Sequence, residues 1–368
     1  MADDASPRAA GEGATPPQSP KRRLRDRPLY QLTLVRYLEF LREPEAMFWT
    51  FVFPILLTAG LGLAFRSKPP EIAKLGVLEG PRAEAVAASL AADPRVEVAR
   101  LDDSAAAQRL RTGKIAVLVV PGPEAAVTYR FDDTRPDART ARALADDILQ
   151  RAAGRADPVT VSEETVRERG SRYIDFLVPG LLGMNLMGTG IWGIGFAIVD
   201  QRRKKLLKRL VATPMSRAHY LMSFVLSRFG YLVLEVAILV GFGVLVFGVP
   251  LRGSLGTLAL GSVLAGLMFG GVGLLIASRA KTIEGASGLM NLAMVPMWVF
   301  SGVFFNAANF PQAIQPFVQA LPLTAAVDAL RATMLEGATL SQLAPEFGIM
   351  AAWMIGTFGL ALRIFRWL

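Results

Sequence analysis

Long apolar runs separated by charged segments are the dominant pattern along the chain. Six runs reach or approach the roughly 20 apolar residues that a helix needs to cross about 30 Å of hydrocarbon. They are Ala46–Phe65, Phe176–Val199, Tyr220–Val249, Leu255–Ser278, Gly285–Phe305 and Phe347–Leu362, the last being the shortest. The pattern predicts a mainly α-helical polytopic membrane protein with six transmembrane helices. Pro54 is expected to kink the first of them.

Two segments precede the first span. Residues 1–27 are rich in Ala, Pro, Gly and Ser and end in a basic cluster, which predicts a disordered basic tail. Residues 28–45 have helical periodicity and predict an amphipathic interfacial helix before the first transmembrane helix at 46–65. Its apolar face would hold Leu34, Val35, Leu38 and Leu41, and its polar face Arg36, Glu39, Arg42 and Glu43.

Residues 66–173, between the first two spans, have the pattern of a folded domain. Four β-branched stretches predict strands at Lys74–Glu79, Val96–Leu101, Ile115–Pro121 and Ala126–Phe131. Helical spacing is found at Ala83–Ala92, Ser104–Arg111 and Asp137–Ala153. Alternation of the two predicts an inserted α/β domain. The remainder, 174–368, is then a transmembrane domain with five helices.

Two further segments of that domain are not spans. Residues 200–219 hold seven basic residues against one acid, and Leu206, Leu207, Leu210 and Val211 share one helical face. This pattern predicts a short basic amphipathic helix that ends near Thr213-Pro214. Residues 306–345 are apolar but broken by prolines, which predicts two short re-entrant outer helices.

Basic residues in the short connections predict the orientation. With the N-terminus in the cytoplasm, the inside segments hold eighteen basic residues, and the short outside segments hold only Arg252 and Arg331. We therefore expect a multi-pass protein of a bacterial inner (plasma) membrane with both termini cytoplasmic. The α/β domain would be extracytoplasmic.

Composition narrows the chemistry further. The chain has no cysteine and one histidine, His219, so the usual zinc ligand sets cannot be assembled, and we expect no metal site. Gly113-Lys114 lacks the other residues of a P-loop, and no nucleotide site is evident. The net charge of +9 adjoins apolar runs, which favours a membrane surface over nucleic acid as its partner. We expect no catalytic residue and no cofactor in this chain.

Four polar residues fall within the predicted spans and are candidates for the transport pathway. Arg228 and Glu235 are seven residues apart, so they share a helix face. Glu235 could line a cavity or relay a proton, the pair could be structural, or Arg228 could reach the interface. Asn185 and Asn291 suit hydrogen bonds between helices. Methionine and tryptophan of the second and fifth spans could line an adaptable apolar path.

The order of these segments resembles the type-2 membrane subunits (permeases) of ATP-binding-cassette (ABC) exporters, in particular members with a large outer domain between the first two spans. The resemblance covers about Pro28–Leu368. It rests on Leu41–Pro44, Tyr173–Asn185, Leu207–Pro214 with Ser216, Gly273–Ser278, and Ser301–Phe305 followed by Pro311 and Pro322. At the start of the basic segment many relatives have a glycine preceded by acids. This chain has Lys205 there, preceded by Arg203 and Lys204.

The resemblance implies that the chain forms a transmembrane pathway and moves a drug-like, lipid or other amphiphilic substrate outward. ATP and Mg would be bound and hydrolysed by a separate ABC ATPase subunit. Expected partners are that ATPase, a second permease copy, the lipid bilayer and, as a further candidate, a periplasmic adaptor. The residues that would couple to the ATPase are Arg202, Lys205, Leu206, Leu207, Lys208, Arg209, Leu210, Val211 and Pro214.

Two other functions fit parts of the pattern. A proton-driven secondary transporter could use Glu235, although no inverted repeat accompanies that single carboxylate. A membrane-anchored sensor could bind a ligand with the outer domain, but anchoring does not need six spans.

Overall fold

A computed structural model describes residues 28–66, 72–123, 126–159, 161–162, 168–206, 217–280 and 282–365. The chain divides into two compact units. One, the sheet unit, spans Ala64–Arg167. The other, the helical unit, combines the residues up to Leu63 with those from Glu168 onward. The predicted boundaries of the inserted domain, 66 and 173, fall within a few residues of these limits.

The sheet unit contains four strands in the order β2-β1-β3-β4. They are β1 (Ala73–Leu78), β2 (Val96–Leu101), β3 (Val117–Pro121) and β4 (Val127–Phe131). Strand β1 pairs in parallel with β2 and β3, and β4 is antiparallel to β3. Helix α4 (Ala83–Ala91) connects β1 to β2, α5 (Asp103–Arg111) connects β2 to β3, and α6 (Pro136–Ala152) follows β4. The α/β pattern expected from the sequence is present here, with strand ends shifted by at most two residues.

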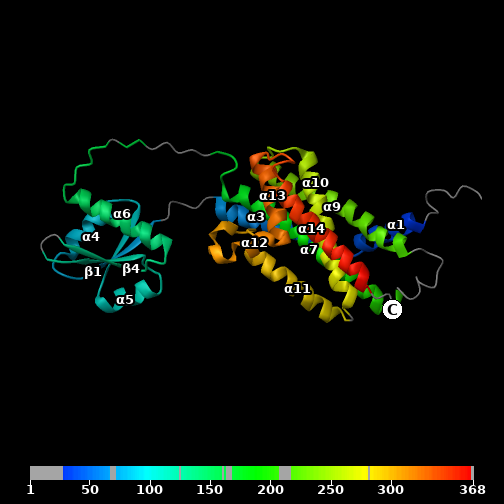
Figure 1. Cartoon of the computed structure of the whole chain (residues 1–368). Coiled ribbons are helices and arrows are strands. Elements are labelled where there is room, and N and C mark those ends of the chain that lie inside the picture. Colours follow the sequence, from blue (N-terminus) through cyan, green and yellow to red (C-terminus); the bar gives the residue numbers. More distant parts are fainter. Residues whose placement is uncertain are drawn as a thin grey trace, which may run out of the picture. The chain divides into compact units, whose positions relative to one another are not determined.

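Helices cover both faces of this sheet, but unequally (Figure 1). Helices α4 and α6 pack together on one face, where Leu75, Val77, Val117 and Val119 of β1 and β3 are fully buried. The other face carries only α5, a helix of nine residues, over a smaller cluster centred on Leu101, Ala106, Ile115 and Leu118. The N-terminal part of that face is therefore left without a covering helix.

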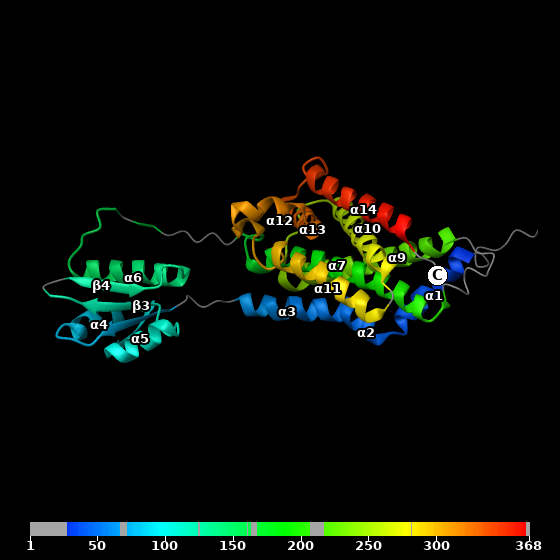
Figure 2. The ribbon, with the colours of Figure 1, turned by 60° about the horizontal axis from the view of Figure 1, so that its bottom comes forward.

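The helical unit holds the predicted spans. Its elements are α1 (Pro28–Leu41), α2 (Pro44–Met47), the π-helical turn η2 (Phe48–Val52), α3 (Phe53–Arg66), α7 (Tyr173–Arg203), α9 (Arg217–Phe247), α10 (Leu255–Arg279), α11 (Ile283–Phe300), the short turns η3 (Ala307–Asn309) and η4 (Gln312–Ile314), α12 (Gln315–Ala320), α13 (Pro322–Arg331), η5 (Ala332–Glu336) and α14 (Ala344–Ile364). Helices α7 and α11 pack along one another, as Figure 2 shows.

Five helical segments within the described part of the chain are long and apolar enough to cross a membrane: Pro44–Phe65, Tyr173–Arg203, Met222–Phe247, Leu255–Arg279 and Ala344–Ile364. A sixth is reached if Gln312–Ala320 and Pro322–Glu336, bent by 83°, form one broken span. Helix α11, at the predicted fifth span Gly285–Phe305, is not one of these segments and ends at Phe300 after 18 residues. The last span is the shortest of the five, as predicted, although α14 is longer than expected with 21 residues.

Helices α7 and α10 form the centre of the helical unit. Half of the most apolar stretch of α7 and 61% of that of α10 is buried inside the chain, against 17% for α14. Glycine makes their close packing feasible: a Cβ on Gly273 of α10 would lie 2.6 Å from the carbonyl oxygen of Ile191 on α7. Gly180, Gly183, Gly190 and Gly195 of α7 likewise face close neighbours within the chain.

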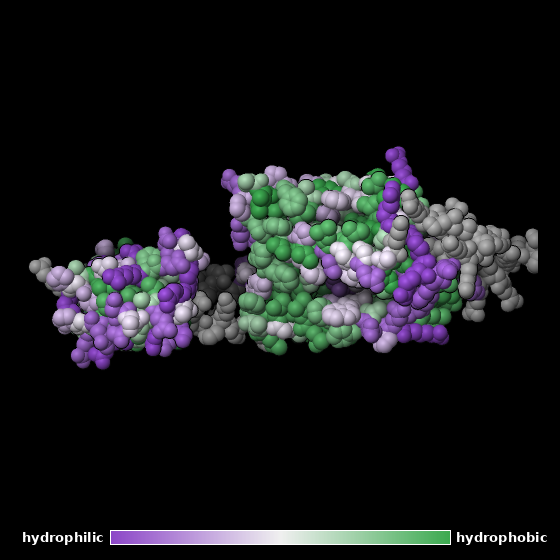
Figure 3. Space-filling model, turned by 90° about the horizontal axis from the view of Figure 1, so that it is seen from below, coloured by the Kyte–Doolittle hydropathy of each residue, from purple (hydrophilic) through white to green (hydrophobic). Residues whose placement is uncertain are grey.

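The outward face of the helical unit is largely apolar. Figure 3 shows hydrophobic side chains over most of the unit's visible surface, with hydrophilic ones gathered near its ends. Exposed residues such as Leu245, Leu292 and Ile355, each at least two-thirds accessible, belong to three different helices. An apolar surface of this extent is what lipid tails cover. The protein is thus a mainly helical, multi-pass membrane protein.

The broken pair α12–α13 packs against the bundle, which is how non-helical backbone is tolerated within a membrane. Residues Leu323–Val327 and Ala329–Leu330 are buried. Arg331 at the end of α13 donates to the carbonyl of Gly302 at 2.8 Å, and its guanidinium lies 3.7 Å from the centre of the Phe176 ring. This arginine ties the broken pair to the ends of α7 and α11. The two short helices predicted from the prolines are present.

Candidate functional site

Helix α1 is bound lengthwise to α9 by polar and aromatic contacts. Arg36 is 9% exposed, its Nε donates to Ser223 Oγ at 3.0 Å, and its guanidinium carbon lies 3.2 Å from the centre of the Phe224 ring. Two turns further along α9, the Tyr231 hydroxyl donates to the backbone carbonyl of Arg36 at 2.9 Å. Tyr37 packs edge-on against Tyr231, with ring centres 4.9 Å apart. Helices α1 and α9 therefore form one packed pair.

This contact concerns the predicted polar face of α1. Arg36 was assigned to that face, and Leu34, Val35, Leu38 and Leu41 to the apolar face of a helix lying along the membrane. In the structure Arg36 is the residue of α1 that is buried, and those four residues are exposed. The helix packs through its arginine and tyrosine side chains and leaves its leucines for lipid. Burial lowers the pKa of Arg36 from its ordinary value, and nearby Tyr220 partly opposes that shift.

The segment predicted to couple to an ATPase is only partly described. Its first residues, Asp200–Arg203, are the last turn of α7, and Arg217–His219 begin α9, so neither end forms a separate helix. Leu207, Lys208, Arg209, Leu210, Val211 and Pro214 lie outside the described residues. The two flanking helices have 31 residues each. At 1.5 Å per residue each spans about 46 Å, more than the hydrocarbon thickness.

Arg202, predicted to contact the ATPase, makes its described contacts inside the chain. Its Nη1 donates to the carbonyls of Ala277 and Ala280 at 2.8 and 2.7 Å. These are carbonyls at the C-terminal end of α10, where the helix has no N–H partners of its own to offer. Next to it, the Tyr220 hydroxyl donates to Gln201 Oε1 at 2.5 Å. The ends of α7, α9 and α10 are therefore linked at one place.

Lys205 has the backbone of a glycine. Its φ is +57°, the one positive value among the described non-glycine residues. Its N–H donates to the Arg202 carbonyl at 3.0 Å, which ends α7 with a left-handed residue. Left-handed backbone favours glycine, the residue that many permeases of the resembled family have here. Lys205 thus keeps the left-handed backbone that glycine would adopt and differs from glycine only in carrying a side chain.

A buried polar cluster joins α7 and α9. Arg228 and Glu235 form an ion pair, with Nη1 3.0 Å from Oε2, and Glu235 is 1% exposed. Thr189 on α7 completes it, since its hydroxyl accepts from Arg228 Nη2 at 2.6 Å and lies 3.0 Å from Glu235 Oε1. The shared face predicted from the seven-residue spacing is confirmed. Arg228 does not extend to the interface, because its side chain is 9% exposed.

The same face of α7 reaches the first span. Asn185 Nδ2 donates to the backbone carbonyl of Thr50 at 3.2 Å, within the π-helical turn η2. In a regular helix that carbonyl would accept from residue 54, but Pro54 has no N–H. The irregularity expected at Pro54 therefore lies just before it, and Asn185 supplies the missing donor. This confirms the interhelical hydrogen bond predicted for Asn185.

The other candidates are separate from this cluster. Asn291 lies on the exposed side of α11. Met187, Met290, Met294 and Met297 are buried in the main core, and a Cβ on Gly195 of α7 would meet Met290 Cε. The interface of α7 with α11 is thus filled by methionine. No group of three acidic or histidine side chains among the described residues could hold a metal.

Several contact residues were missed from the sequence. Thr189 follows Asn185 by one helical turn, a spacing that would have placed it in the polar cluster. No comparable spacing in the sequence indicated that Arg36 is buried, because its burial depends on which face of α1 meets α9. Tyr220 and Tyr231 frame the α9 surface that receives it, and aromatic residues near a span end are common enough to carry little information.

Comparison with known proteins places these features in a family. Residues 45–363 match the model of the ABC-2 family transporter protein. The chain is also similar to nodulation protein J of Bradyrhizobium diazoefficiens, with 24% identity over 206 residues, which cover 54% of this chain and 76% of the relative. The family match begins in the first span and includes the sheet unit, the polar cluster and α14. This chain therefore belongs to the ABC-2 family of transporter proteins.

Proposed function

We propose that the chain is the permease subunit of an ATP-driven exporter in a bacterial inner membrane. Two permease copies would form the pathway, and a separate ABC ATPase would bind and hydrolyse ATP with Mg at the cytoplasmic side, where both chain termini lie. The observation that carries this proposal is how α7 ends and α9 begins. Two 31-residue helices extend beyond membrane thickness and are joined by a short segment rich in basic residues.

Contacts at the cytoplasmic ends of the helices would transmit a movement of the basic segment into the membrane-spanning bundle. Helix α9 begins within the last residues of the basic segment, and α1 is attached to it through Arg36 and Tyr231. Helix α7 ends within the first residues of the segment and is attached to α10 through Arg202. A shift of the segment by an ATPase would therefore act on two pairs of helices, α1 with α9 and α7 with α10. Rigid-body movement of packed helices is a common way to open and close a pathway.

Arg228, Glu235 and Thr189 lie between these two pairs. Because they link α9 to α7 in the middle of the bundle, we assign them the role of holding the pairs in one relative position. A proton-relay role for Glu235 is a separate expectation. It predicts that transport depends on the carboxylate itself, so that Glu235→Gln would abolish transport even where assembly is normal.

The methionines of the bundle support an amphiphilic substrate, either drug-like or a lipid. They fill the interface of α7 and α11, and such flexible, polarizable groups adapt to apolar ligands of different shape.

Coupling is tested with the double variant Leu206→Asp/Leu210→Asp, made in the full chain and expressed with its ATPase. Two carboxylates on the apolar face of the segment should weaken the complex, because a docked apolar face would have to bury unpaired charge. Co-purification and ATP hydrolysis are the measurements. Leu340→Asp is the matched control, since Leu340 is 51% exposed and lies between η5 and α14.

The double variant should lose ATPase co-purification while Leu340→Asp retains it. Both proteins should elute as folded species in size-exclusion chromatography, which separates a docking defect from misfolding. Normal assembly and normal hydrolysis by the double variant would refute the coupling assignment.

A further inference from the structure

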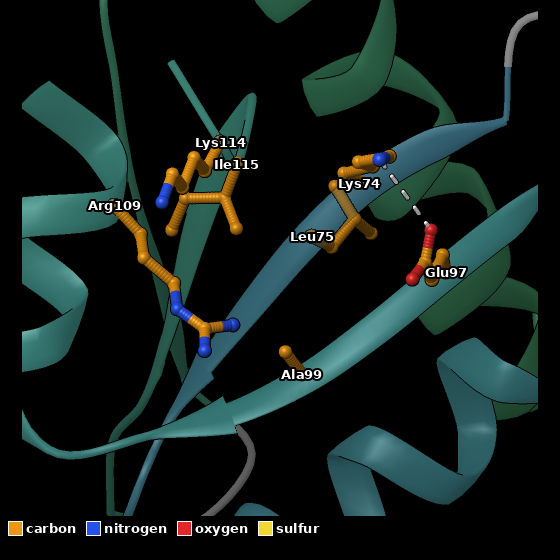
Figure 4. Close-up of a pocket in the computed structure, with 7 residues that line it drawn as sticks. All are labelled: Lys74, Leu75, Glu97, Ala99, Arg109, Lys114 and Ile115. Atoms are coloured by element: carbon orange, nitrogen blue, oxygen red, sulfur yellow. Dashed lines mark ion pairs between the residues drawn. The ribbon is translucent and has the colours of Figure 1, made fainter. Parts of the chain in front are cut away.

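The sheet unit contains a pocket whose walls are mainly cationic. It encloses about 340 Å³ at the N-terminal ends of β1 and β2, beside α5. Its charged lining consists of Lys74, Arg109 and Lys114 with one carboxylate, Glu97, and the residues Leu75, Ala99 and Ile115 complete it. Figure 4 shows these residues on β1, β2, α5 and the connection that follows α5, with Lys74 and Glu97 directed towards each other. The formal charge of the lining is therefore +2.

The pocket exists because α5 is too short to cover its face of the sheet. Alternation along β1 places Leu75 under α4 and α6, and Lys74 on the α5 side. Lys74 is paired in register with Glu97 of β2, and Gly76 with Ala99. The apolar cluster beneath α5 begins only with Leu101, Ile115 and Leu118. The polar N-terminal ends of β1 and β2 are therefore uncovered, and small side chains form the base of the pocket.

Two of the cations are not neutralised. Lys74 Nζ lies 3.9 Å from Glu97 Oε2, a loose pair between exposed side chains. Arg109 and Lys114 form no ion pair with any residue in the described part of the sheet unit. Figure 4 shows Arg109 reaching from α5 towards Ala99 on β2. An open site with two free cations and one loosely paired cation attracts an anion.

Helix capping does not account for these cations. Basic residues often end helices because they interact with the last carbonyls. At the end of α5, however, backbone N–H groups serve those carbonyls: Thr112 N donates to Gln108 O at 2.9 Å, Gly113 N to Leu110 O at 3.1 Å, and Lys114 N to Arg109 O at 2.9 Å. The last bond also fixes the two cationic residues on one tight turn. Their side chains are held near each other in advance of any ligand.

We propose that this pocket binds the oxyanion group, carboxylate or phosphate, of a small polar molecule. The planar guanidinium of Arg109 matches the two oxygens of either group, and Lys114 supplies a second positive charge. The volume lies at the lower end of the range for ligand sites, which limits the bound part to about one sugar ring. This proposal is independent of the exporter function and of the ATPase.

Equilibrium dialysis tests the proposal on the full chain in a neutral detergent at low ionic strength. Labelled inorganic phosphate and labelled glucuronate are the two probes, and labelled glucose is the neutral control. Saturable binding of phosphate alone assigns the phosphate group, binding of glucuronate alone assigns the carboxylate, and binding of both assigns a general oxyanion site. Glucose should not bind.

Three variants test which charged side chains determine the affinity for the anion. Arg109→Ala/Lys114→Ala should weaken binding at least tenfold, since each lost charge a few ångströms away changes affinity about fivefold. Glu97→Gln should tighten binding about fivefold, because it removes the one repelling charge. Arg111→Ala should leave affinity within about twofold. Arg111 is an exposed cation of the same helix that does not line the pocket.

All four substituted residues are exposed, so their variants should keep the circular-dichroism spectrum of the parent chain. The proposal is overturned if neither probe binds saturably, or if Arg111→Ala weakens binding as much as the double variant does. Weaker binding in Glu97→Gln would also overturn it, since that result would show that the carboxylate attracts the ligand.

Discussion

The hydrogen bond from Asn185 to Thr50 shows how a single residue repairs an irregular helix. Pro54 removes the N–H that would serve the Thr50 carbonyl, and Asn185 Nδ2 donates to that carbonyl from α7 at 3.2 Å. Thr50 is 8% exposed, so water is a poor substitute for the asparagine. An unpaired buried carbonyl costs about 1–3 kcal/mol. The stability of the first span should thus depend on these two residues together.

A double-mutant cycle measures that dependence. Asn185→Ala should lower the thermal unfolding midpoint of the purified protein, because the Thr50 carbonyl loses its donor. The same substitution made together with Pro54→Ala should cost about 1 kcal/mol less, since alanine restores the N–H at position 54. Additive effects of the two substitutions would show that Asn185 and Pro54 act independently.

The ion pair of Arg228 with Glu235 leads to a second prediction about single substitutions. Removing one member leaves a buried charge, whereas replacing both with apolar residues does not. Arg228→Met should destabilise the protein by about 3–5 kcal/mol, and Arg228→Met/Glu235→Leu by much less. Chemical denaturation in mixed micelles is a suitable measurement. If the double variant is stable but does not transport, the cluster has a role in the pathway beyond holding α7 and α9 together.

At the scale of elements, α1 and α9 are expected to move as one body. Arg36→Ala removes the contacts to Ser223 and Phe224 and should detach α1, which will then exchange its amide hydrogens faster. Arg42→Ala is the control, because Arg42 is an exposed arginine just beyond the same helix. Hydrogen-exchange mass spectrometry of the peptides that contain α1 gives the comparison. Equal exchange in both variants would contradict the attachment of α1 through Arg36.

The elements differ in how well their sequences define them. All four strands were predicted because Val and Ile cluster between turn residues, and that pattern is local. The burial of Arg36 on the predicted polar face of α1 was not foreseen, because an arginine can pack on aromatic rings. The end of α11 was also missed. Apolar residues continue past Phe300 to Phe305, but Gly302 has φ +71°, a turn that composition does not reveal.

At the scale of the whole molecule, the predicted orientation places the sheet unit outside the cell. The absence of cysteine from the sequence allows a direct test with single introduced cysteines. Ser104→Cys on α5 should react with a membrane-impermeant maleimide in intact spheroplasts. Glu284→Cys at the start of α11 should react only after the membrane is opened. Both side chains are exposed, so burial does not bias the comparison. The reverse labelling pattern would contradict the orientation.

ATP hydrolysis tests the division of labour between this chain and a separate ATPase. The chain should be purified alone and with its candidate ABC ATPase, and both preparations assayed in proteoliposomes. We expect no hydrolysis by the chain alone and hydrolysis by the complex that responds to substrate-like amphiphiles. Hydrolysis that is the same whether or not this chain is present, or transport by this chain without any ATPase, would contradict it.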